Sequence, residues 1–324
     1  QVHYPFERKD WFDAHFPADF IVEGLDQTRG WFYSLHVLGT ALHHKPAYKH
    51  CMATGLVMAE GGVKMSKKLG NYPDPYIILN TSGSDAMRWF LLSSAIVHGG
   101  NVCMDYEGKE VAKAMRQALM PLWNAYYFFC LYANAEGIKA KEITTSNDVL
   151  DRYILAKLKD VSVGVHNDMN RYDTPAASNK IVEFLDLLNN WYIRRSRKRF
   201  SKSDDKQDKI EAFEALYTAM KTFTLCAAPF IPFITEQMWQ NLKLDSDKDS
   251  VHLSDFPIYN EKFRDENLEF RMATVQKAVS MGRSLRNQFN LKNRQPLASA
   301  EIVTHGSNTV EACDPYARTT GVNG

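Results

Sequence analysis

The sequence predicts an α/β segment followed by an all-α segment, and three observations support this fold class. Short apolar runs at 18–22 and 54–58 are each followed by a glycine-containing turn, as strands of an α/β sheet are. From Asp151 onward apolar residues recur at helical spacing, with no alternating strand pattern between them. A polar, weakly patterned stretch at 137–148 separates the two halves.

The composition of the 324 residues, 45% apolar and 24% charged, is that of a globular protein long enough for two domains. Because the formal net charge is only +1, any nucleic-acid-binding surface must be local. The five cysteines lack Cys-x-x-Cys spacing, which argues against structural zinc and indicates a reducing, cytoplasmic location. No apolar run approaches the ~20 residues that span a membrane. The chain begins with Gln1 and no targeting segment, so we expect an internal piece of a longer protein.

The first half opens with an irregular, aromatic lead-in and then a buried strand at 18–22. A helix is expected to begin near Asp26 and to run through Trp31 to Leu42. Glu23, Asp26 and Gln27 would then lie at the carboxyl end of a strand, where α/β sheets bind ligands. Their oxygens suit an amino group and ribose hydroxyls, and Trp31 suits the wall of an apolar pocket. The alternatives are that Asp26 is only a helix cap and that Trp31 is a core residue.

Two lysines follow the second apolar run. Gly61 and Gly62 permit a tight reversal with positive φ, and the string Lys64-Met65-Ser66-Lys67 comes directly after it. Lysine carries a compact charge on a flexible stem, and at ~4 Å one ammonium attracts one phosphate charge by roughly 4 kcal/mol before desolvation. The alternative is a solvated lysine turn with no ligand.

Further helices are expected along the rest of the chain. The first, at 83–92, would be capped by Ser84 or Asp85, and the next, at about 110–134, follows a glycine-rich loop. The bundle helices would follow the stripe from Ile154 to Val165, a helix capped by Thr174 with Pro175 in its first turn, and three more. Those three lie at about 213–227, 235–242 and 265–289, and 298–304 reads as a short strand.

A basic patch lies at the end of the second bundle helix. Six cations stand within nine positions beside two aromatic residues: Trp191, Tyr192, Arg194, Arg195, Arg197, Lys198, Arg199 and Lys202. The helix dipole accounts for two or three cations at a carboxyl end. The excess, with aromatic rings alongside, predicts contact with RNA phosphates and unpaired bases.

These motifs resemble those of the isoleucyl-tRNA synthetases, which are class I aminoacyl-tRNA synthetases. Lys64 to Lys67 resembles the Lys-Met-Ser-Lys-Ser signature, with Lys68 in the place of the last serine. The string Glu-Gly-x-Asp-Gln-x-Arg-Gly-Trp-Phe at 23–32 resembles the segment that contacts the aminoacyl-adenylate. Trp-Tyr-Ile-Arg-Arg-Ser-Arg at 191–197 and the Pro-rich 228–236 resemble the anticodon-binding bundle. Asn-Tyr-Pro-Asp-Pro at 71–75 is more like the eukaryotic-type branch.

The resemblance implies a role for each matching residue. It makes Lys64 and Lys67 the catalytic charges on the triphosphate and assigns ATP contacts to Lys64, Met65, Ser66, Lys67, Gly55 and Val57. It assigns the aminoacyl-adenylate to Glu23, Gly24, Asp26, Gln27 and Trp31, and tRNA to Trp191, Tyr192, Arg194, Arg195, Arg197, Lys198 and Arg199. Thr54 departs from the residues usual in the family, and its role is left open.

The resemblance also implies an architecture. It predicts the second half of a Rossmann-type catalytic domain at 1–98, a connecting helical segment at 99–148, a helix-bundle anticodon-binding domain at 149–260, and a carboxyl-terminal helix and junction at 261–324. The His-x-Gly-His motif and an editing insertion, both expected of the whole enzyme, would precede Gln1. We therefore expect this chain by itself to form the adenylate poorly.

The implied activity is ligation of isoleucine to tRNA(Ile), with ATP and Mg²⁺ as substrate and without structural zinc or another bound metal. A cytoplasmic monomer is expected. Two alternatives remain at this point, a fragment of a valyl-tRNA synthetase and a non-catalytic tRNA-binding module. An apolar pocket separates isoleucine from valine by only about 10²-fold, and isoleucyl-tRNA synthetases are themselves the usual example of that limit.

Overall fold

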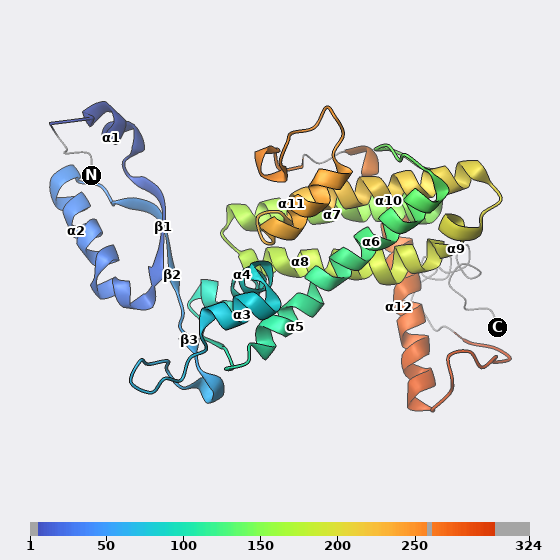
Figure 1. Ribbon diagram of the computed structural model, residues 1–324, viewed down its shortest axis with the longest axis horizontal. Helices are drawn as coiled ribbons and strands as arrows, with labels where there is room; N and C mark the ends of the chain where they lie inside the picture. The colour runs from blue at the N-terminus through green and yellow to red at the C-terminus, as the bar shows by residue number, and fades with distance from the viewer. Residues whose placement is uncertain (1–5, 258–260, 302–324) are drawn as a thin grey trace. The chain divides into compact units, whose positions relative to one another are not determined.

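The computed structural model describes residues 6–257 and 261–301, except for the side chains of Lys202 and Glu261 (Figure 1). The described residues group into two compact units. Unit 1 takes its residues from 1–127, 163–186 and 223–257, and unit 2 from 128–162, 187–222 and 258–324. Among the described residues no helix is long and apolar enough to cross a membrane.

Unit 1 begins with a β–α–β arrangement. Its elements are α1 (Lys9–His15), β1 (Ala18–Gly24), the 3₁₀ turn η1 (Leu25–Arg29), α2 (Trp31–His43) and β2 (Tyr48–Thr54). β1 and β2 pair in parallel, from Ala18 opposite Tyr48 to Gly24 opposite Thr54. The expected strand and helix are therefore confirmed, but α2 begins at Trp31 and a 3₁₀ turn occupies the stretch from Leu25 to Arg29.

The expectation of a buried strand at 18–22 is wrong. Only Ile21 of β1 is buried, and Leu38 and Leu42 of α2 are 55% and 68% exposed. Parallel sheets normally have both faces covered. Here two strands meet one helix, of which only Phe32 and Gly39 are buried, so many apolar side chains of this region remain exposed.

Between β2 and the lysine turn, the backbone at Gly55 passes very close to the backbone at Gly100. Gly55 is buried, and a Cβ built on it would lie 1.7 Å from the carbonyl oxygen of Gly100, so only glycine fits. The chain then forms β3 (Val57–Met58), which pairs in parallel with β4 (Val102–Cys103), and the 3₁₀ turn η2 (Glu60–Gly62). The loop expected at 99–110 therefore contains a short strand that the sequence pattern did not reveal.

Helices α3 (Pro75–Ser82) and α4 (Ser84–Leu92) follow, then η3 (Ala95–His98), α5 (Lys109–Gln117) and α6 (Leu119–Glu136). The helix expected at 110–134 is thus two helices that meet at Ala118. The expected cap of α4 is wrong, because Ser84 and Asp85 are helical and Gly83 precedes them without a side-chain cap. The Asp85 carboxylate instead accepts the N–H groups of Phe233 (3.2 Å) and Ile234 (2.7 Å), so it caps a distant helix.

The rest of the described chain is helical. It comprises α7 (Val149–Asn170), α8 (Thr174–Asp186), a π-helical turn η4 (Leu187–Ile193), α9 (Arg194–Lys202), α10 (Lys206–Ala227), α11 (Pro232–Leu242), η5 (Val251–Leu253), η6 (Glu261–Phe263) and α12 (Glu266–Gln288). The expected helices are confirmed. Asp173, not Thr174, caps α8, since its carboxylate accepts the Ala176 N–H (3.0 Å). Residues 298–301 form no strand, and 302–304 lie outside the described residues.

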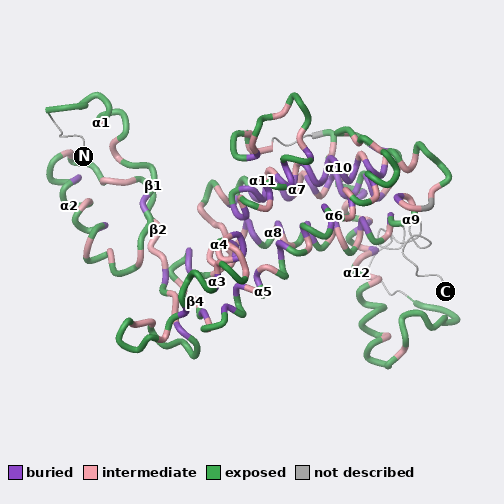
Figure 2. The backbone as a smooth tube through the Cα atoms, in the orientation of Figure 1, coloured by how far each residue is buried: buried purple, intermediate pink, exposed green. Residues whose placement is uncertain are grey.

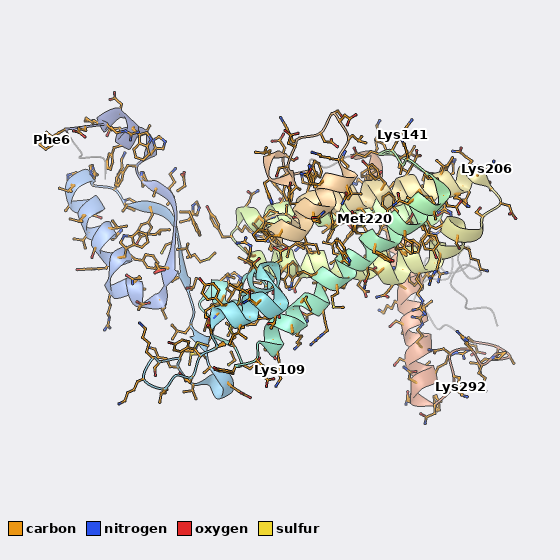
Figure 3. The ribbon with its side chains drawn as sticks, in the orientation of Figure 1. Phe6, Lys109, Lys141, Lys206, Met220 and Lys292 are labelled. Atoms are coloured by element: carbon orange, nitrogen blue, oxygen red, sulfur yellow. The ribbon has the colours of Figure 1, made fainter. Side chains whose placement is uncertain are left out.

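Buried residues concentrate in these helices, as the colouring of Figure 2 shows. The apolar stripe of α7 that includes Ile154, Leu158 and Val161 is almost fully buried. Met220 of α10, labelled in Figure 3, is fully buried. The helical spacing of apolar residues in the sequence therefore predicted the core of this half well.

Candidate functional site

The turn after β1 is held by its own polar side chains. Gln27 Oε1 accepts the N–H of Trp31 (2.8 Å) and thereby caps α2, and Gln27 Nε2 donates to Asp26 Oδ2 (3.2 Å). A Cβ on Gly24 would lie 2.7 Å from Asp26 Oδ1, and a Cβ on Gly30 would lie 2.6 Å from Gln27 Oε1. The two glycines therefore leave room for the two polar side chains.

The alternatives for Asp26 and Trp31 do not hold in the structure. Gln27 rather than Asp26 caps α2, and the Asp26 side chain is exposed. Trp31 is 49% exposed, so it is not a core residue. Both side chains remain accessible to a ligand at the carboxyl end of β1.

Glu23 and Thr54 lie at the same end of the strand pair. Glu23 stands opposite Ala53 in the register and is exposed. Thr54 Oγ1 donates to the Glu23 carbonyl oxygen (3.3 Å), which gives the unexplained threonine a structural role.

The lysine turn is a glycine reversal as predicted. Gly61 and Gly62 have φ values of 76° and 74°. The reversal returns the chain so that Lys64 pairs antiparallel with Met58, and the Ala59 N–H donates to the Val63 carbonyl oxygen (2.8 Å). This explains how two exposed lysines come to follow a strand directly.

Lys64 and Lys67 carry free charges. Both are exposed, and neither ammonium forms a hydrogen bond or ion pair with any residue that the structure describes. Met65 and Ser66 between them are half-buried. Ser66 Oγ accepts the N–H of Leu69 (3.1 Å), which leaves its own hydroxyl proton available to a ligand.

Gly55 and Val57, the expected contacts of the adenine, lie in the crossing between β2 and β3. The Gly55 N–H donates to the Ile96 carbonyl oxygen (2.9 Å) and is therefore already used inside the protein. Val57 is half-buried in β3. Asn101, which the sequence did not single out, fixes the residue between them by accepting the Leu56 N–H (2.9 Å).

The β2 strand links the two groups of residues. Gly24 pairs with Thr54, and Met58, which pairs with Lys64, is four residues further along, at most ~14 Å of extended chain. The carboxylates at 23–26 therefore follow the carboxyl end of β1, and the lysines at 64–67 follow β3, which the chain enters from the carboxyl end of β2 through Gly55 and Leu56. Such an end is where α/β folds bind nucleotides.

Two members of the basic patch are parts of the interior of unit 2. Tyr192 is fully buried, and its hydroxyl contacts Asp151 Oδ1 (2.8 Å) and the Ala212 carbonyl oxygen (3.2 Å). Arg199 donates to both oxygens of Asp151 (2.8 and 3.0 Å) and to Asp208 Oδ1 (2.7 Å). The predicted RNA contact by Tyr192 and Arg199 is therefore not compatible with this structure.

Burial acts to lower the pKa of Arg199, but the hydrogen bonds and charge of Asp151 outweigh it and raise that pKa. The guanidinium therefore stays charged at any ordinary pH. Asp151 is fully buried and also accepts the hydroxyl of Ser146 (2.9 Å). This buried network replaces the solvent that the charges lose on folding.

The other cations of α9 form an exposed face. Arg194, Arg197 and Lys198 follow the helical spacing of three and four residues, and all three are exposed. None of their charged groups is paired with a residue in the described parts of the chain. Because α9 buries Ser196 and Phe200 on its opposite side, the free cations point to one side of the helix.

Arg195 lies at the edge of this face and stacks on Trp191. The guanidinium carbon is 4.8 Å from the ring centroid, and Trp191 Nε1 in turn contacts Met272 Sδ of α12 (3.2 Å). Burial and the nearby Arg283 charge lower the pKa of Arg195. Its Nε is buried and has no hydrogen-bond partner among the described residues.

The described residues contain no group of three or more His, Cys, Asp or Glu side chains placed to hold a metal ion. None of the described cysteines forms a disulfide.

Two family models match the chain. The model described as tRNA synthetases class I (I, L, M and V) matches residues 1–103, and the anticodon-binding domain of tRNA ligase matches residues 151–302. Their order is the one expected from the sequence, and the fold class is confirmed.

The chain is similar to bacterial isoleucine–tRNA ligases along most of its length. It is 50% identical to the one from Treponema denticola, over 94% of this chain and 29% of the relative. The values for Leifsonia xyli are 49%, 95% and 27%, and for Wolbachia pipientis 44%, 95% and 27%. The chain therefore spans less than a third of the length of these relatives.

Solved structures share the fold at low identity. A Mycobacterium tuberculosis methionyl-tRNA synthetase bound by methionyl-adenylate has a TM-score of 0.60 at 20% identity, covering 74% of this chain and 47% of that one. An Agrobacterium radiobacter LeuRS in a ternary complex with tRNA and LeuAMS has a TM-score of 0.58 at 21% identity, covering 76% and 29%.

Proposed function

This chain is a class I tRNA synthetase segment followed by an anticodon-binding domain, and on that premise we propose that it is part of an isoleucine–tRNA ligase. The whole enzyme would react isoleucine with ATP to give isoleucyl-adenylate and pyrophosphate, and then transfer the acyl group to tRNA(Ile) with release of AMP. Mg²⁺ would enter as part of the nucleotide substrate. The relatives give no support to the valyl or non-catalytic alternatives, since those named above are all isoleucine–tRNA ligases.

One observation carries the catalytic part of the proposal. Lys64 and Lys67 are held exposed and unpaired, among the described residues, on a turn after β3, and the chain enters β3 from the carboxyl end of the β1–β2 pair, which Glu23, Asp26 and Trp31 adjoin. Ammonium groups in this position would neutralise the charge that develops on the triphosphate while the carboxylate of isoleucine attacks the α-phosphate and pyrophosphate leaves. A preorganised donor of this kind is worth about 10²–10³ in rate.

The residues near β1 would hold the adenylate. Glu23 and Asp26 supply acceptors for the ammonium group and the ribose hydroxyls, with Gly24 leaving space beside Asp26. Gln27 contributes indirectly, because its amide is bonded to Asp26 and to the start of α2. Trp31 would form part of the isoleucine pocket. Gly55 and Val57 would line the adenine site, with Met65 and Ser66 beside the phosphates.

The exposed face of α9 would contact tRNA. It comprises Arg194, Arg197 and Lys198, with Arg195 and Trp191 at its edge. Tyr192 and Arg199 are not included, because both side chains are hydrogen-bonded to the buried Asp151. We propose a cytoplasmic monomer with the four domain bounds given above. The bacterial relatives do not support a eukaryotic-type branch.

Amino-acid-dependent exchange of pyrophosphate into ATP by the full-length ligase that contains this chain tests the proposal. Exchange with isoleucine in clear excess of valine is expected, by about 10²-fold in kcat/KM. A preference for valine, or exchange that does not depend on the amino acid, would sink the assignment.

A further inference from the structure

We propose that Asn71 is a positioning residue of the reaction, whose side-chain amide fixes the segment that presents Lys64 and Lys67 to the polyphosphate. This inference rests on the proposed function, since it assumes that the two lysines act on ATP. Both polar atoms of the Asn71 amide are bonded to the backbone of Lys64 and Ser66. It acts through the backbone of the turn.

The hydrogen bonds of Asn71 join both ends of the short segment from Lys64 to Ser66. Its Oδ1 accepts the N–H of Ser66 (2.9 Å), and its Nδ2 donates to the carbonyl oxygen of Lys64 (3.2 Å). One planar amide therefore bonds to the backbone on each side of Met65. This arrangement fixes the backbone from which the Lys64 side chain leaves.

A second pair of hydrogen bonds involves Ser66 and holds the residues on the other side of Lys67. The Ser66 carbonyl oxygen accepts the N–H of Gly70 (3.0 Å), and Ser66 Oγ accepts the N–H of Leu69 (3.1 Å). Along the chain, Lys67 therefore lies between Ser66, which is hydrogen-bonded to Asn71, and a one-turn reversal that ends at Gly70, next to Asn71. A change at Asn71 is expected to move both lysines.

Packing does not hold this turn. Lys64, Lys67 and Leu69 are exposed, and a Cβ built on Gly61, Gly62 or Gly70 would meet no atom within 4 Å. With so few packing contacts, side-chain-to-backbone hydrogen bonds supply the order. Of the four bonds within residues 64–71, two belong to Asn71.

Asn71 itself is anchored to a more rigid element. It is half-buried, and Pro73 two residues later is buried. Asp74 then caps α3 by accepting the Tyr76 N–H (2.9 Å), with Pro75 in the first helical position. The amide of Asn71 therefore connects the open turn to the start of a capped helix.

The expected consequence is a loss of rate rather than of amino-acid binding. Misplacement of a charge by about 1 Å can cost about 10²-fold in rate, and a freed turn samples such displacements. We expect Asn71→Ala in the full-length ligase to lower kcat of isoleucine-dependent pyrophosphate exchange by about 10- to 100-fold. The KM for isoleucine should stay within about twofold, because the adenylate residues near β1 are untouched.

Two further variants separate positioning from folding. Asn80→Ala is the matched control, since Asn80 is exposed on α3 and makes no side-chain hydrogen bond among the described residues; wild-type kinetics are expected. Asn71→Asp keeps the shape and the acceptor for Ser66 but loses the donor to Lys64, so an intermediate rate is expected. In a Lys67→Ala background, Asn71→Ala should add less than it costs alone, because both act on one group.

The outcomes distinguish the two proposals. A wild-type ligase that shows no exchange with isoleucine contradicts the proposed function. An active ligase in which Asn71→Ala matches Asn80→Ala contradicts the positioning role alone. Equal losses in kcat and isoleucine affinity with a lowered Tm, or full additivity with Lys67→Ala, would make Asn71 a general structural residue and also overturn the inference.

Discussion

The lysine turn and the carboxyl end of the π-helix–α9 segment both gather cations, yet they use them in different ways. In the turn, Lys64 and Lys67 have no partner among the described residues, and hydrogen bonds from the Asn71 and Ser66 side chains to the backbone hold the chain. In α9, Arg199 is enclosed by Asp151 and Asp208, while Arg194 and Arg197 face solvent. A cluster of charges in sequence is therefore a mixture of structural and available groups, sorted by what each side chain meets.

The difference follows from local geometry. The reversal built on Gly61 and Gly62 leaves the side chains of Lys64, Lys67 and Lys68 exposed, with Met65 and Ser66 half-buried between them. A helix instead turns successive residues through about 100°, so a run of six basic residues must include some that face the core. Arg199 is such a residue, and it is tolerated there because two carboxylates meet it.

The largest expected effect concerns the two lysines of the turn. The double variant Lys64→Ala/Lys67→Ala in the full-length ligase should lower kcat of isoleucine-dependent exchange by at least about 10³-fold. Its Tm should change by less than about 2 °C, because neither side chain has a partner among the described residues to lose.

Lys68→Ala is the control within the same turn. Lys68 is also exposed and unpaired among the described residues, and nothing assigns it to the nucleotide. We expect rates within about threefold of wild type. Equal losses from the Lys68 and the double variant would show that the turn contributes only diffuse positive charge.

The second effect breaks the comparison in α9. Arg199→Met removes one partner of a buried pair and leaves the Asp151 carboxylate uncompensated, so the free energy of unfolding should fall by about 3 kcal/mol. Urea denaturation of this chain followed by circular dichroism measures it. Arg197→Met, on the exposed face, should stay within about 0.5 kcal/mol.

A double variant sharpens this result. In Arg199→Met/Asp151→Leu both charges are gone, and much of the lost stability should return, because an apolar pair carries no desolvation cost. If Arg199→Met is as stable as wild type, the pair with Asp151 does not stabilise the fold. Arg199 would then belong with the exposed cations of the proposed tRNA-contacting face.

How far the sequence predicts the molecule depends on the range of the interaction concerned. The periodicity of Ile154 and Leu158 and the positive φ of Gly61 are local consequences of residue type, and both are confirmed. The role of Asp85 was missed because the N–H groups that it caps lie 148 and 149 positions away.

The site shows the same limit. The pattern at 23–32 predicted an adenylate-binding segment, but it could not indicate that Gln27 rather than Asp26 caps α2. It also could not separate Arg199 from Arg197, since the partner Asp151 lies on another helix. Asn71 stood out in the sequence only as the first residue of the string at 71–75, and its two hydrogen bonds to the backbone of the turn appear only in the structure.

A third effect tests the exposed face of α9. Arg194, Arg197 and Lys198 changed together to Gln should weaken binding of tRNA(Ile) to the full-length ligase by about tenfold at physiological salt. The slope of log Kd against log salt should fall by about 2, at ~0.7 for each phosphate that the variant no longer neutralises. Filter binding over a salt series gives both numbers.

The matched control changes three lysines outside the basic patch. Lys139, Lys141 and Lys206 are exposed and unpaired among the described residues, and the last two are labelled in Figure 3. Their change to Gln removes the same net charge. If both triple variants lose the same affinity, tRNA responds to the overall charge and α9 is not its contact surface.

The smallest effect concerns a charge that a helix end holds in place, intermediate between the free lysines and the buried arginine. The pKa of Asp173 is lowered, mainly by the hydrogen bond from the N–H of Ala176 and to a smaller extent by the hydrogen bond and charge of His98. A lowered pKa in the folded state means that Asp173 stabilises the fold above its ordinary pKa, ~3.9, and that this contribution is lost as pH falls through the lower folded value.

Asp173→Asn keeps the cap but not the charge, so it should cost about 0.5 kcal/mol at pH 7 and nothing near pH 2. Urea midpoints of this chain and the variant across that range provide the measurement. A cost that persists unchanged at pH 2 would show that the side chain acts by shape alone. The charge of Asp173 would then contribute nothing to the stability of the fold, as we expect of the exposed cations of α9.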